Sequence, residues 1–482
     1  MSLLKADSDT IAAISTGMVT AGIGVIRISG DDAVRIADSI FVPGKPAESG
    51  KPDHEGLPEE RDKGPYPLSG RRTHTITYGS VCDGGEIIDD VLVMLMRAPH
   101  TYTGEDTVEI SCHGGLFVVS RVLDTVIRAG ARLAEPGEFT KRAFVNGKMD
   151  LTRAEAVAGL IEAENERARK ASVSQLSGRE EAVIRGIQEK ILLIMAFAEA
   201  ALDDPEHISV DDEIDTIKGD LRGIYESLER LKSTAGYGRL ITEGIRTAIA
   251  GKPNAGKSSF LNMLLGEDRS IVSDIAGTTR DTIREKVNLG TFTLTVIDTA
   301  GITMSDDPIE KIGVERAKGE IGKADLILYI MDGSVPFDAN DEEIISGLKG
   351  RKVIGIVNKS DLEPAVSVEK AAGKLPGVPV ISASALQGTG VRELTAQIEE
   401  MFFGNEEEKE SDVILLNKRH EYALEAASEA MRQTLAGIDA GMSEEFWLVD
   451  LKDVYDRLGE ITGETVGENL IDEIFSKFCM GK

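Results

Sequence analysis

The sequence is poor in several residue types. It contains three cysteines and one tryptophan among 482 residues, and aromatic residues make up 5%. Cys82, Cys112 and Cys479 are too few and too scattered to indicate a disulfide framework or a zinc site, and they fit a reducing compartment. No run of about 18 apolar residues occurs, which excludes a membrane-spanning helix. The opening residues lack the apolar stretch of a secretory signal, so we expect a cytoplasmic protein.

Basic residues are scarce relative to acidic ones. The chain has 54 Lys and Arg against 83 Asp and Glu, which gives a net charge of −29. This acidity argues against a general polyanion binder, because a nucleic acid would be repelled unless a local basic patch or a partner protein offset the charge. The length suffices for about three domains of roughly 150 residues each.

Changes in composition along the chain predict where the domains lie. Residues 1–147 alternate short β-branched runs with a helical run at 116–128, which predicts a mixed α/β domain. Residues 148–243 and 405–482 are dominated by apolar residues at helical spacing, which predicts a helical bundle in two parts. Residues 244–404 alternate strands and helices, as in a mostly parallel sheet. We therefore expect an α/β domain inserted into an all-α domain.

The strongest chemical signal is the segment GKPNAGKS at 251–258, which matches the phosphate-loop pattern. It follows a predicted strand and opens a predicted helix, whose N-terminus favours anions. The glycines let backbone amides turn toward phosphates. Lys257 brings a positive charge to the β and γ oxygens, and the Ser258 hydroxyl can bind magnesium. The nucleotide contacts expected from this loop are Asn254, Ala255, Gly256, Lys257, Ser258 and Ser259.

Three companion motifs follow in the order of a guanine-nucleotide site. DTAG at 298–301 ends an apolar strand, so that Asp298 can hold magnesium through water and Gly301 can contact the γ-phosphate. NKSD at 358–361 places a carboxylate where it can accept hydrogen bonds from guanine N1 and the exocyclic amine, two donors that adenine lacks. SAS at 382–384 can close over the base. The expected contacts from the last two motifs are Asn358, Lys359, Asp361, Ser382, Ala383 and Ser384.

The segment GTTRD at 277–281 lies where a switch region supplies a second magnesium ligand, so Thr278 or Thr279 is the candidate. Arg280 in the same segment is either an internal arginine finger or the ion-pair partner of a nearby acid, and we favour the ion pair.

The position after Gly301 is occupied by Ile302. Ras-like hydrolases orient the attacking water with a glutamine there, which an isoleucine cannot do. Hydrolysis must therefore follow another route or be slow. Asn254 in the phosphate loop is a candidate for holding a monovalent cation beside the phosphates, although asparagine also commonly makes local turn hydrogen bonds.

Several motifs outside the nucleotide site are similar to those of a single family. They are DTIAA at 9–13, GVIRISG at 24–30, YTGED at 102–106, HGG at 113–115, PGEFTKRAFVNGKMDL at 136–151 and the final FCMGK at 478–482. With these motifs the chain resembles the MnmE (TrmE) family of tRNA modification GTPases over nearly its whole length. Other phosphate-loop GTPases share only the middle domain.

The resemblance implies a function that composition alone could not reveal. It implies a potassium-dependent GTP hydrolase that works with an FAD-dependent partner, GidA (MnmG), in a heterotetramer. Together they would install an aminomethyl or carboxymethylaminomethyl group at C5 of the wobble uridine of tRNA, using a tetrahydrofolate derivative as one-carbon donor. Residues 1–147 would bind the folate and form a homodimer, and residues 244–404 would be the G domain.

Motif matching to the family also implies roles for single residues. Arg27, Glu109, Lys148 and Lys482 would contact the folate, although Arg27 and Glu109 would also suit a cross-strand ion pair. Ser258 and Thr279 would bind magnesium, and potassium would be held by Asn254, Ser273, Ile275 and Thr278. Glu310 would orient the attacking water, and Cys479 would lie near the reaction centre, so the catalytic set would be Glu310, Lys257 and Cys479.

Two other functions are compatible with parts of the sequence. A ribosome-assembly GTPase would share the middle domain, but the chain has neither a second phosphate loop nor a basic RNA-binding tail. A nucleotide-gated scaffold that hydrolyses GTP slowly is favoured by Ile302 alone.

Overall fold

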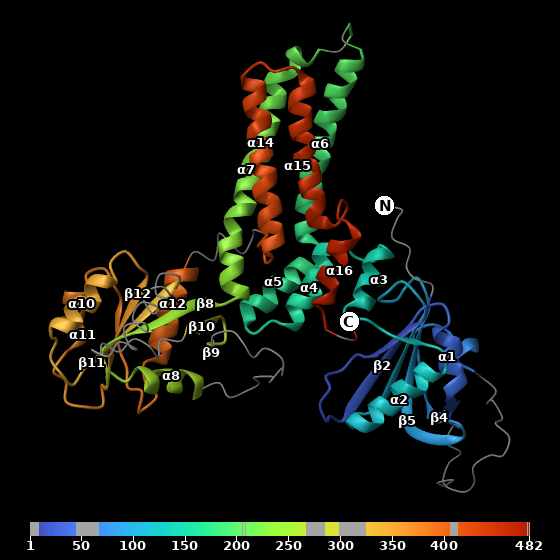
Figure 1. Ribbon diagram of the computed structural model, residues 1–482, viewed down its shortest axis with the longest axis horizontal. Coiled ribbons are helices and arrows are strands. Elements are labelled where there is room, and N and C mark those ends of the chain that lie inside the picture. The colour runs from blue at the N-terminus through green and yellow to red at the C-terminus, as the bar shows by residue number, and fades with distance from the viewer. Residues whose placement is uncertain are drawn as a thin grey trace, which may run out of the picture. The chain divides into compact units, whose positions relative to one another are not determined.

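The computed structural model describes residues 9–44, 67–204, 206–207, 209–266, 285–297, 324–404, 413–479 and 481. Figure 1 shows the helices and strands in these ranges. The chain divides into two compact units. The first comprises Met1–Ala158, Leu176–Ile214 and Gln433–Lys482, and the second comprises Gly159–Gln175 and Asp215–Arg432.

A seven-stranded sheet forms the N-terminal part of the first unit, in the order β3-β4-β5-β6-β2-β1-β7. Neighbouring strands are antiparallel except for β1 and β7, which run parallel. The strands are β1 (Ile11–Ile14), β2 (Ile23–Ser29), β3 (Phe41–Pro43), β4 (Thr75–Asp83), β5 (Glu86–Met96), β6 (Thr107–His113) and β7 (Arg132–Leu133).

One face of this sheet is covered by two helices, α1 (Ala33–Ile40) and α2 (Leu116–Arg128). Apolar residues at alternate positions, among them Ile26, Ile28 and Ile110, are fully buried in this core. Burying a side chain of this size stabilises the fold by about 1.5–3 kcal/mol. The alternation also fixes the register, because a slip by one residue would turn these side chains to the other face. In this register Arg27 lies opposite Glu109.

The other face of the sheet is covered only in part. At β1, Ile11 and Ala13 pack with Tyr102 and with Phe139 of α3 (Glu138–Val145). Over β4 and β5, by contrast, Ile76, Tyr78 and Leu92 are exposed by 61%, 58% and 48%. The register pairs Tyr78 with Leu92 and Ile76 with Met94, so these side chains share this face and form an exposed apolar surface.

Helices make up the rest of the first unit. Helix α4 (Leu151–Ile161) begins in it, α6 (Arg179–Asp203) packs along α15 (Glu444–Thr462), and α16 (Glu468–Ser476) packs on α3. Phe144 of α3 and Phe475 of α16 have ring centroids 6.3 Å apart, within an apolar cluster that includes Leu151 and Ile471. The end of the chain is thereby joined to the N-terminal sheet region.

A six-stranded sheet forms the centre of the second unit, in the order β13-β12-β11-β8-β10-β9. All neighbours are parallel except β9, which is antiparallel to β10. The strands are β8 (Ile245–Ala250), β9 (Glu285–Asn288), β10 (Thr293–Ile297), β11 (Leu326–Asp332), β12 (Val353–Asn358) and β13 (Val380–Ser382).

Helices cover both faces of this sheet. On one face, α8 (Lys257–Gly266) and α12 (Val391–Phe403) bury Phe260, Leu264, Leu394 and Ile398. On the other face, α11 (Val368–Lys374) and the segment after α10 (Ala339–Gly347) complete a second core. Strands β8, β11 and β12 are buried on both sides, which explains their nearly continuous apolar sequence.

Three further helices belong wholly or mainly to the second unit: α5 (Glu166–Leu176), α7 (Val210–Thr242) and α14 (Lys418–Asp439). Just before α5, Asn165 donates a hydrogen bond to the Thr293 hydroxyl (3.2 Å). Near the end of α7, Arg239 donates to both carboxylate oxygens of Asp325 (3.1 and 2.8 Å). These contacts join the helical segments to the sheet of this unit.

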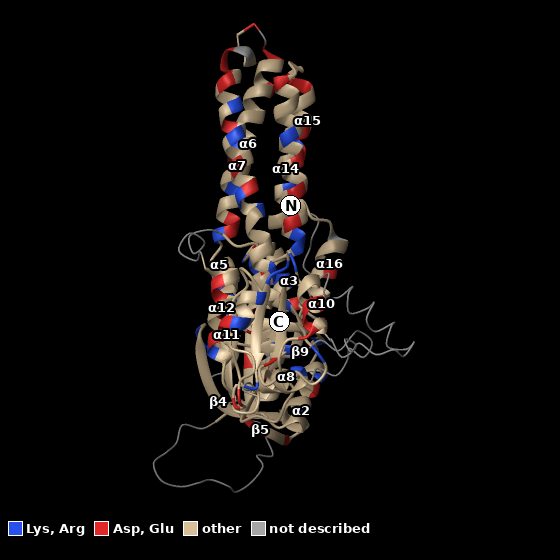
Figure 2. Cartoon of the chain, turned by 90° about the vertical axis from the view of Figure 1, so that its left-hand side faces the viewer, with Lys and Arg blue, Asp and Glu red and all other residues tan. Residues whose placement is uncertain are grey.

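Acidic and basic side chains are interspersed along α6, α7, α14 and α15 (Figure 2). Within the ranges given above, none of the helices combines the length and the apolar character needed to cross a bilayer. The expected fold class is confirmed: an N-terminal mixed α/β domain, helical segments, and a mostly parallel sheet that lies between helical segments in the sequence. The domain boundaries stay a prediction.

Candidate functional site

The phosphate loop connects β8 to α8, as the sequence predicts. Gly251 (φ +150°), Asn254 (φ +62°) and Gly256 (φ +91°) have positive φ. A Cβ on Gly251 would lie 2.3 Å from the Ile330 carbonyl oxygen, and one on Gly256 would lie 2.3 Å from Asn358 Nδ2. Both positions therefore need glycine for space as well as for backbone conformation.

Lys257, the first residue of α8, folds back over the loop. Its Nζ donates hydrogen bonds to the carbonyl oxygens of Gly251 (2.9 Å) and Lys252 (2.8 Å). Burial lowers the pKa of Lys257, because the charged form is poorly solvated there. A phosphate group would restore the interactions that this ammonium lacks, which suits its expected role. Ser258, Ser259 and Asn254 are exposed beside it.

Asn358, at the end of β12, is buried and bridges two predicted motifs. Its Nδ2 donates to the carbonyl oxygen of Ala255 in the phosphate loop (2.9 Å), and its Oδ1 accepts from the backbone N–H of Ala385 after the SAS motif (3.1 Å). Segments that are more than a hundred residues apart in sequence are thus held around one site.

The base-recognition residues are oriented by their neighbours. Asp361 accepts a hydrogen bond from the Ser384 hydroxyl at 2.5 Å. Lys359, with φ +63°, donates to Asp332 at 2.6 Å. Burial favours the neutral form of Asp332, but hydrogen bonds from Lys359 and from Ser334 outweigh it and lower the pKa of Asp332. The carboxylates of Asp332 and Asp361 therefore have fixed orientations at the carboxyl ends of parallel strands, where such folds bind ligands.

Several predicted site residues fall outside the described residues. They are Ser273, Ile275, Thr278, Thr279, Asp298, Gly301, Glu310 and Lys482. The predicted magnesium and potassium ligand sets are therefore represented in the structure only by Ser258 and Asn254.

The predicted folate residues Arg27 and Glu109 meet on the second face of the N-terminal sheet. Arg27 Nε and Nη2 both lie 2.8 Å from Glu109 Oε1, so the cross-strand ion pair is present. The guanidinium carbon lies 5.3 Å from the ring centroid of Tyr102 and 5.6 Å from that of Phe139. Within the described part of the chain, the buried Nη1 of Arg27 has no hydrogen-bond partner. A buried donor without a partner is costly, and a ligand acceptor would satisfy it.

Lys148 and the end of the chain lie against elements of the same unit. Lys148 Nζ donates to the Pro99 carbonyl oxygen (2.9 Å), in the loop that also carries Tyr102. The carbonyl oxygen of Cys479 accepts from the Gly137 N–H (3.4 Å), and that of Gly481 accepts from the Ser15 hydroxyl (3.1 Å). Cys479 is exposed. Cys479 and Gly481 are thus held beside the start of α3 and the end of β1.

Comparison with known proteins gives two family matches that together span most of the chain. Residues 10–148 match the GTP-binding protein TrmE N-terminus, and residues 151–479 match the MnmE helical domain. The tRNA modification GTPase MnmE of Lachnoclostridium phytofermentans is 45% identical over 475 residues, which is 98% of this chain and 100% of that protein. The chain belongs to the MnmE family. The MnmE proteins of Geobacillus thermodenitrificans (43%, covering 98% of this chain and 99% of the relative) and Clostridioides difficile (41%, with the same coverage) are similar in length as well.

Membership in the MnmE family confirms the resemblance that the motifs indicated, and with it a GTPase related to tRNA modification. The roles of the individual site residues stay predictions. Sequence reasoning missed Tyr102 and Phe139 as neighbours of Arg27, although both lie in motifs quoted for the MnmE family. It also missed Asp332, which could have been found from its position at the end of an apolar strand.

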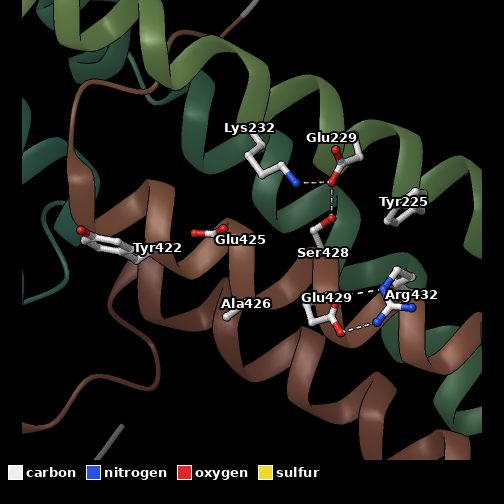
Figure 3. A pocket seen from close by; sticks show the side chains of 9 residues that line it. All are labelled: Tyr225, Glu229, Lys232, Tyr422, Glu425, Ala426, Ser428, Glu429 and Arg432. Carbon is white, nitrogen blue, oxygen red and sulfur yellow. Dashed lines mark hydrogen bonds and ion pairs between the residues drawn. The ribbon is translucent and has the colours of Figure 1, made fainter. Parts of the chain in front are cut away.

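A separate hollow lies between α7 and α14, with a volume of about 470 Å³ (Figure 3). Tyr225 and Tyr422 are among its lining residues. Glu229 accepts hydrogen bonds from Lys232 and Ser428, and Glu429 pairs with Arg432. Most charges that line the hollow are thus paired with one another, and Glu425 is a further lining residue.

Proposed function

We propose that this chain hydrolyses GTP to drive the modification of wobble uridine in tRNA. The observation that carries the proposal is the bridge made by Asn358, which holds the phosphate loop and the base-recognition segments around one site. The relatives are tRNA modification GTPases of the MnmE family, which supports the tRNA part. We also propose a cytoplasmic location, where tRNA is found.

Deletion of the gene is expected to abolish C5-aminomethyl-type wobble uridines in bulk tRNA, as measured by nucleoside mass spectrometry. The intact gene should restore them and a Lys257→Ala copy should not, because that variant lacks the phosphate-loop ammonium. Lys349→Ala, which removes an exposed lysine of the same domain, serves as the matched control. An unchanged nucleoside profile would contradict the tRNA role and direct attention to ribosome assembly.

We further propose the FAD-dependent partner GidA (MnmG), in a heterotetramer, and a carboxymethylaminomethyl or aminomethyl product. Deletion of the partner's gene should then remove the same nucleosides. The homodimer is supported by the exposed apolar surface of β4 and β5, which includes Ile76, Tyr78 and Leu92. Sedimentation as a monomer at micromolar concentration would count against it. Of the proposed domain limits, 147/148 lies between α3 and α4, 243/244 lies just before β8, and 404/405 lies just after α12.

For the metal ions, we propose that Ser258 and Thr279 bind magnesium and that Asn254, Ser273, Ile275 and Thr278 bind potassium. Glu310 would orient the attacking water, which Ile302 cannot do, and Cys479 would lie near the reaction centre. The exposed Asn254 side chain, on a residue with positive φ, is the structural support for the potassium site. A Glu310→Ala variant with unchanged turnover would favour the slow scaffold instead.

Replacing potassium with sodium at equal ionic strength should lower the rate of GTP hydrolysis by about 10²-fold, the scale on which one electrostatic contact to a transition state acts. ATP should not be hydrolysed. Phosphate release is the measurement, and Asn254→Ala should remove the difference between the two salts. Equal rates of the unmodified chain in both salts would contradict the potassium proposal.

The residues around Arg27 fit a folate in their chemistry. The unpartnered Nη1 suits a carboxylate or carbonyl oxygen, Glu109 suits ring N–H donors, and the rings of Tyr102 and Phe139 suit a flat heterocycle. Arg27, Glu109, Lys148 and Lys482 would hold the molecule, which would supply the one-carbon unit.

Arg27→Met should weaken binding of 5-formyltetrahydrofolate by roughly 10- to 150-fold, since hydrogen bonds to a charged group are worth about 1.5–3 kcal/mol. Titration calorimetry on the full chain would measure this. Arg35→Met is the control, because Arg35 is an exposed arginine on α1 of the same unit. Equal folate affinity of the Arg27→Met chain would refute the assignment.

A further inference from the structure

The phosphate loop carries a second lysine, Lys252, at a position where the motif accepts any residue. Its side chain is only 14% exposed, and Nζ lies 2.6 Å from Asp341 Oδ2 and 3.0 Å from Asp338 Oδ2. Partial burial disfavours the charged form, but the two carboxylates outweigh it and raise the pKa of Lys252. The charge of Lys252 is therefore directed to the start of α10.

Asp341 is built into the fold and is 3% exposed. The hydroxyl of Tyr329, which is fully buried in β11, donates to its Oδ1 (2.9 Å), and the backbone N–H of Asp338 donates to its Oδ2 (3.0 Å). Asp338 in turn accepts from the Asp341 N–H (3.2 Å), which completes a capping box at the N-terminus of α10. Groups from a strand, from a helix end and from the phosphate loop thus all donate to the Asp341 carboxylate.

The backbone of Lys252 is tied to the nucleotide lysine. The Lys252 carbonyl oxygen accepts from Lys257 Nζ (2.8 Å) and from the Ala255 N–H (3.3 Å). The Lys257 ammonium has three N–H donors and uses two of them on the Gly251 and Lys252 carbonyl oxygens, so the third can reach a nucleotide phosphate. These two contacts hold Lys257 in a loop that has three residues with positive φ. The contact between Lys252 and Asp341 does not depend on Lys257.

We propose that Lys252 and Asp341 are a positioning pair that keeps the first half of the phosphate loop in its binding conformation, and with it the Lys252 carbonyl oxygen that holds Lys257. The inference rests on the proposed GTP hydrolysis and adds two residues to it. Because the two side chains bind each other, they should affect nucleotide affinity more than the chemical step. KM and kcat should therefore respond differently to their loss.

The test compares variants of the full chain by steady-state GTP hydrolysis and by titration with GTP. Lys252→Met should raise KM and Kd for GTP about tenfold, with kcat within about twofold of the unmodified chain. Lys252→Arg, which can still reach both carboxylates, should restore affinity to within about threefold. Lys349→Met is the matched control.

The double variant Lys252→Met with Asp341→Asn removes both charges and leaves no uncompensated buried carboxylate. It should match Lys252→Met alone, since two residues that act as a pair are not additive. Unchanged KM in Lys252→Met would overturn the inference, and so would a double variant whose loss of GTP affinity clearly exceeds that of Lys252→Met. If the unmodified chain neither binds nor hydrolyses GTP, the proposed function itself fails, which is a separate result.

Discussion

Asp361→Asn is expected to weaken GTP binding by about 10³-fold or more and to create affinity for xanthosine triphosphate. The carboxylate accepts from two guanine donors, whereas an asparagine presents one acceptor and one donor, so the exocyclic amine would meet a second N–H group. Xanthine carries an oxygen in place of that amine and matches the asparagine. Competition against a fluorescent guanine nucleotide measures both affinities.

The matched control for this exchange is Glu363→Gln, an exposed acid two positions further along the same loop. It should leave the affinity for GTP unchanged. The hydroxyl of Ser384, which donates to Asp361 Oδ1, remains available in the asparagine variant and should keep the side chain oriented. Undiminished GTP affinity in Asp361→Asn would show that NKSD does not read the base in this chain.

Arg142→Met is expected to destabilise the N-terminal region of the first unit by about 1.5–3 kcal/mol, because three carboxylates lose a charged hydrogen-bond donor, although Arg132 still pairs with Asp9 and Glu138. The Arg142 side chain is 5% exposed and donates to Asp9 (2.6 Å), Glu138 (3.0 Å) and Glu105 (3.3 Å). Arg142 holds α3 against β1. Because Phe139 belongs to α3, Arg142 also holds the Phe139 ring beside Arg27.

Hydrogen exchange of the amides of β1 and α3 in the full chain would measure this loss of local stability. Arg128→Met is the control, since the pair of Arg128 with Asp83 is half exposed and should be worth less than about 1 kcal/mol. Equal protection in the two variants would mean that the Arg142 network does not support the folate region.

The same network should make this region sensitive to acid. Hydrogen bonds from Arg132 and Arg142 lower the pKa of Asp9, and at Glu138 they outweigh the effect of burial and lower its pKa as well. The ordinary pKa is 3.8 for Asp and 4.5 for Glu. A carboxyl whose pKa in the folded chain is lower than this contributes its full stabilisation when the pH is above the ordinary value. Its contribution is then lost as the pH falls through the folded pKa.

Local patterns sufficed for much of the fold and of the nucleotide site. The helix predicted at 116–128 has the same limits in the structure, because an amphipathic repeat of that length is a strong local signal. Lys257, Asn358 and Asp361 could be identified because each lies at a fixed distance from a strand end. Tyr102 and Phe139 could not be placed beside Arg27, since they come from a loop and a helix that only the packed sheet brings together.

By itself, the sequence determined the order of elements, the phosphate loop and the base-reading motif, because these depend on residues that are neighbours along the chain. It also carried the motifs of the MnmE family, and the comparisons confirm that membership. Only the tertiary structure decided that the Lys252 ammonium is paired with Asp341 and that, among the residues the structure describes, one buried nitrogen of Arg27 has no partner. Both facts follow from the packing of segments far apart in sequence, and the desolvation and pairing of a charge depend on that packing.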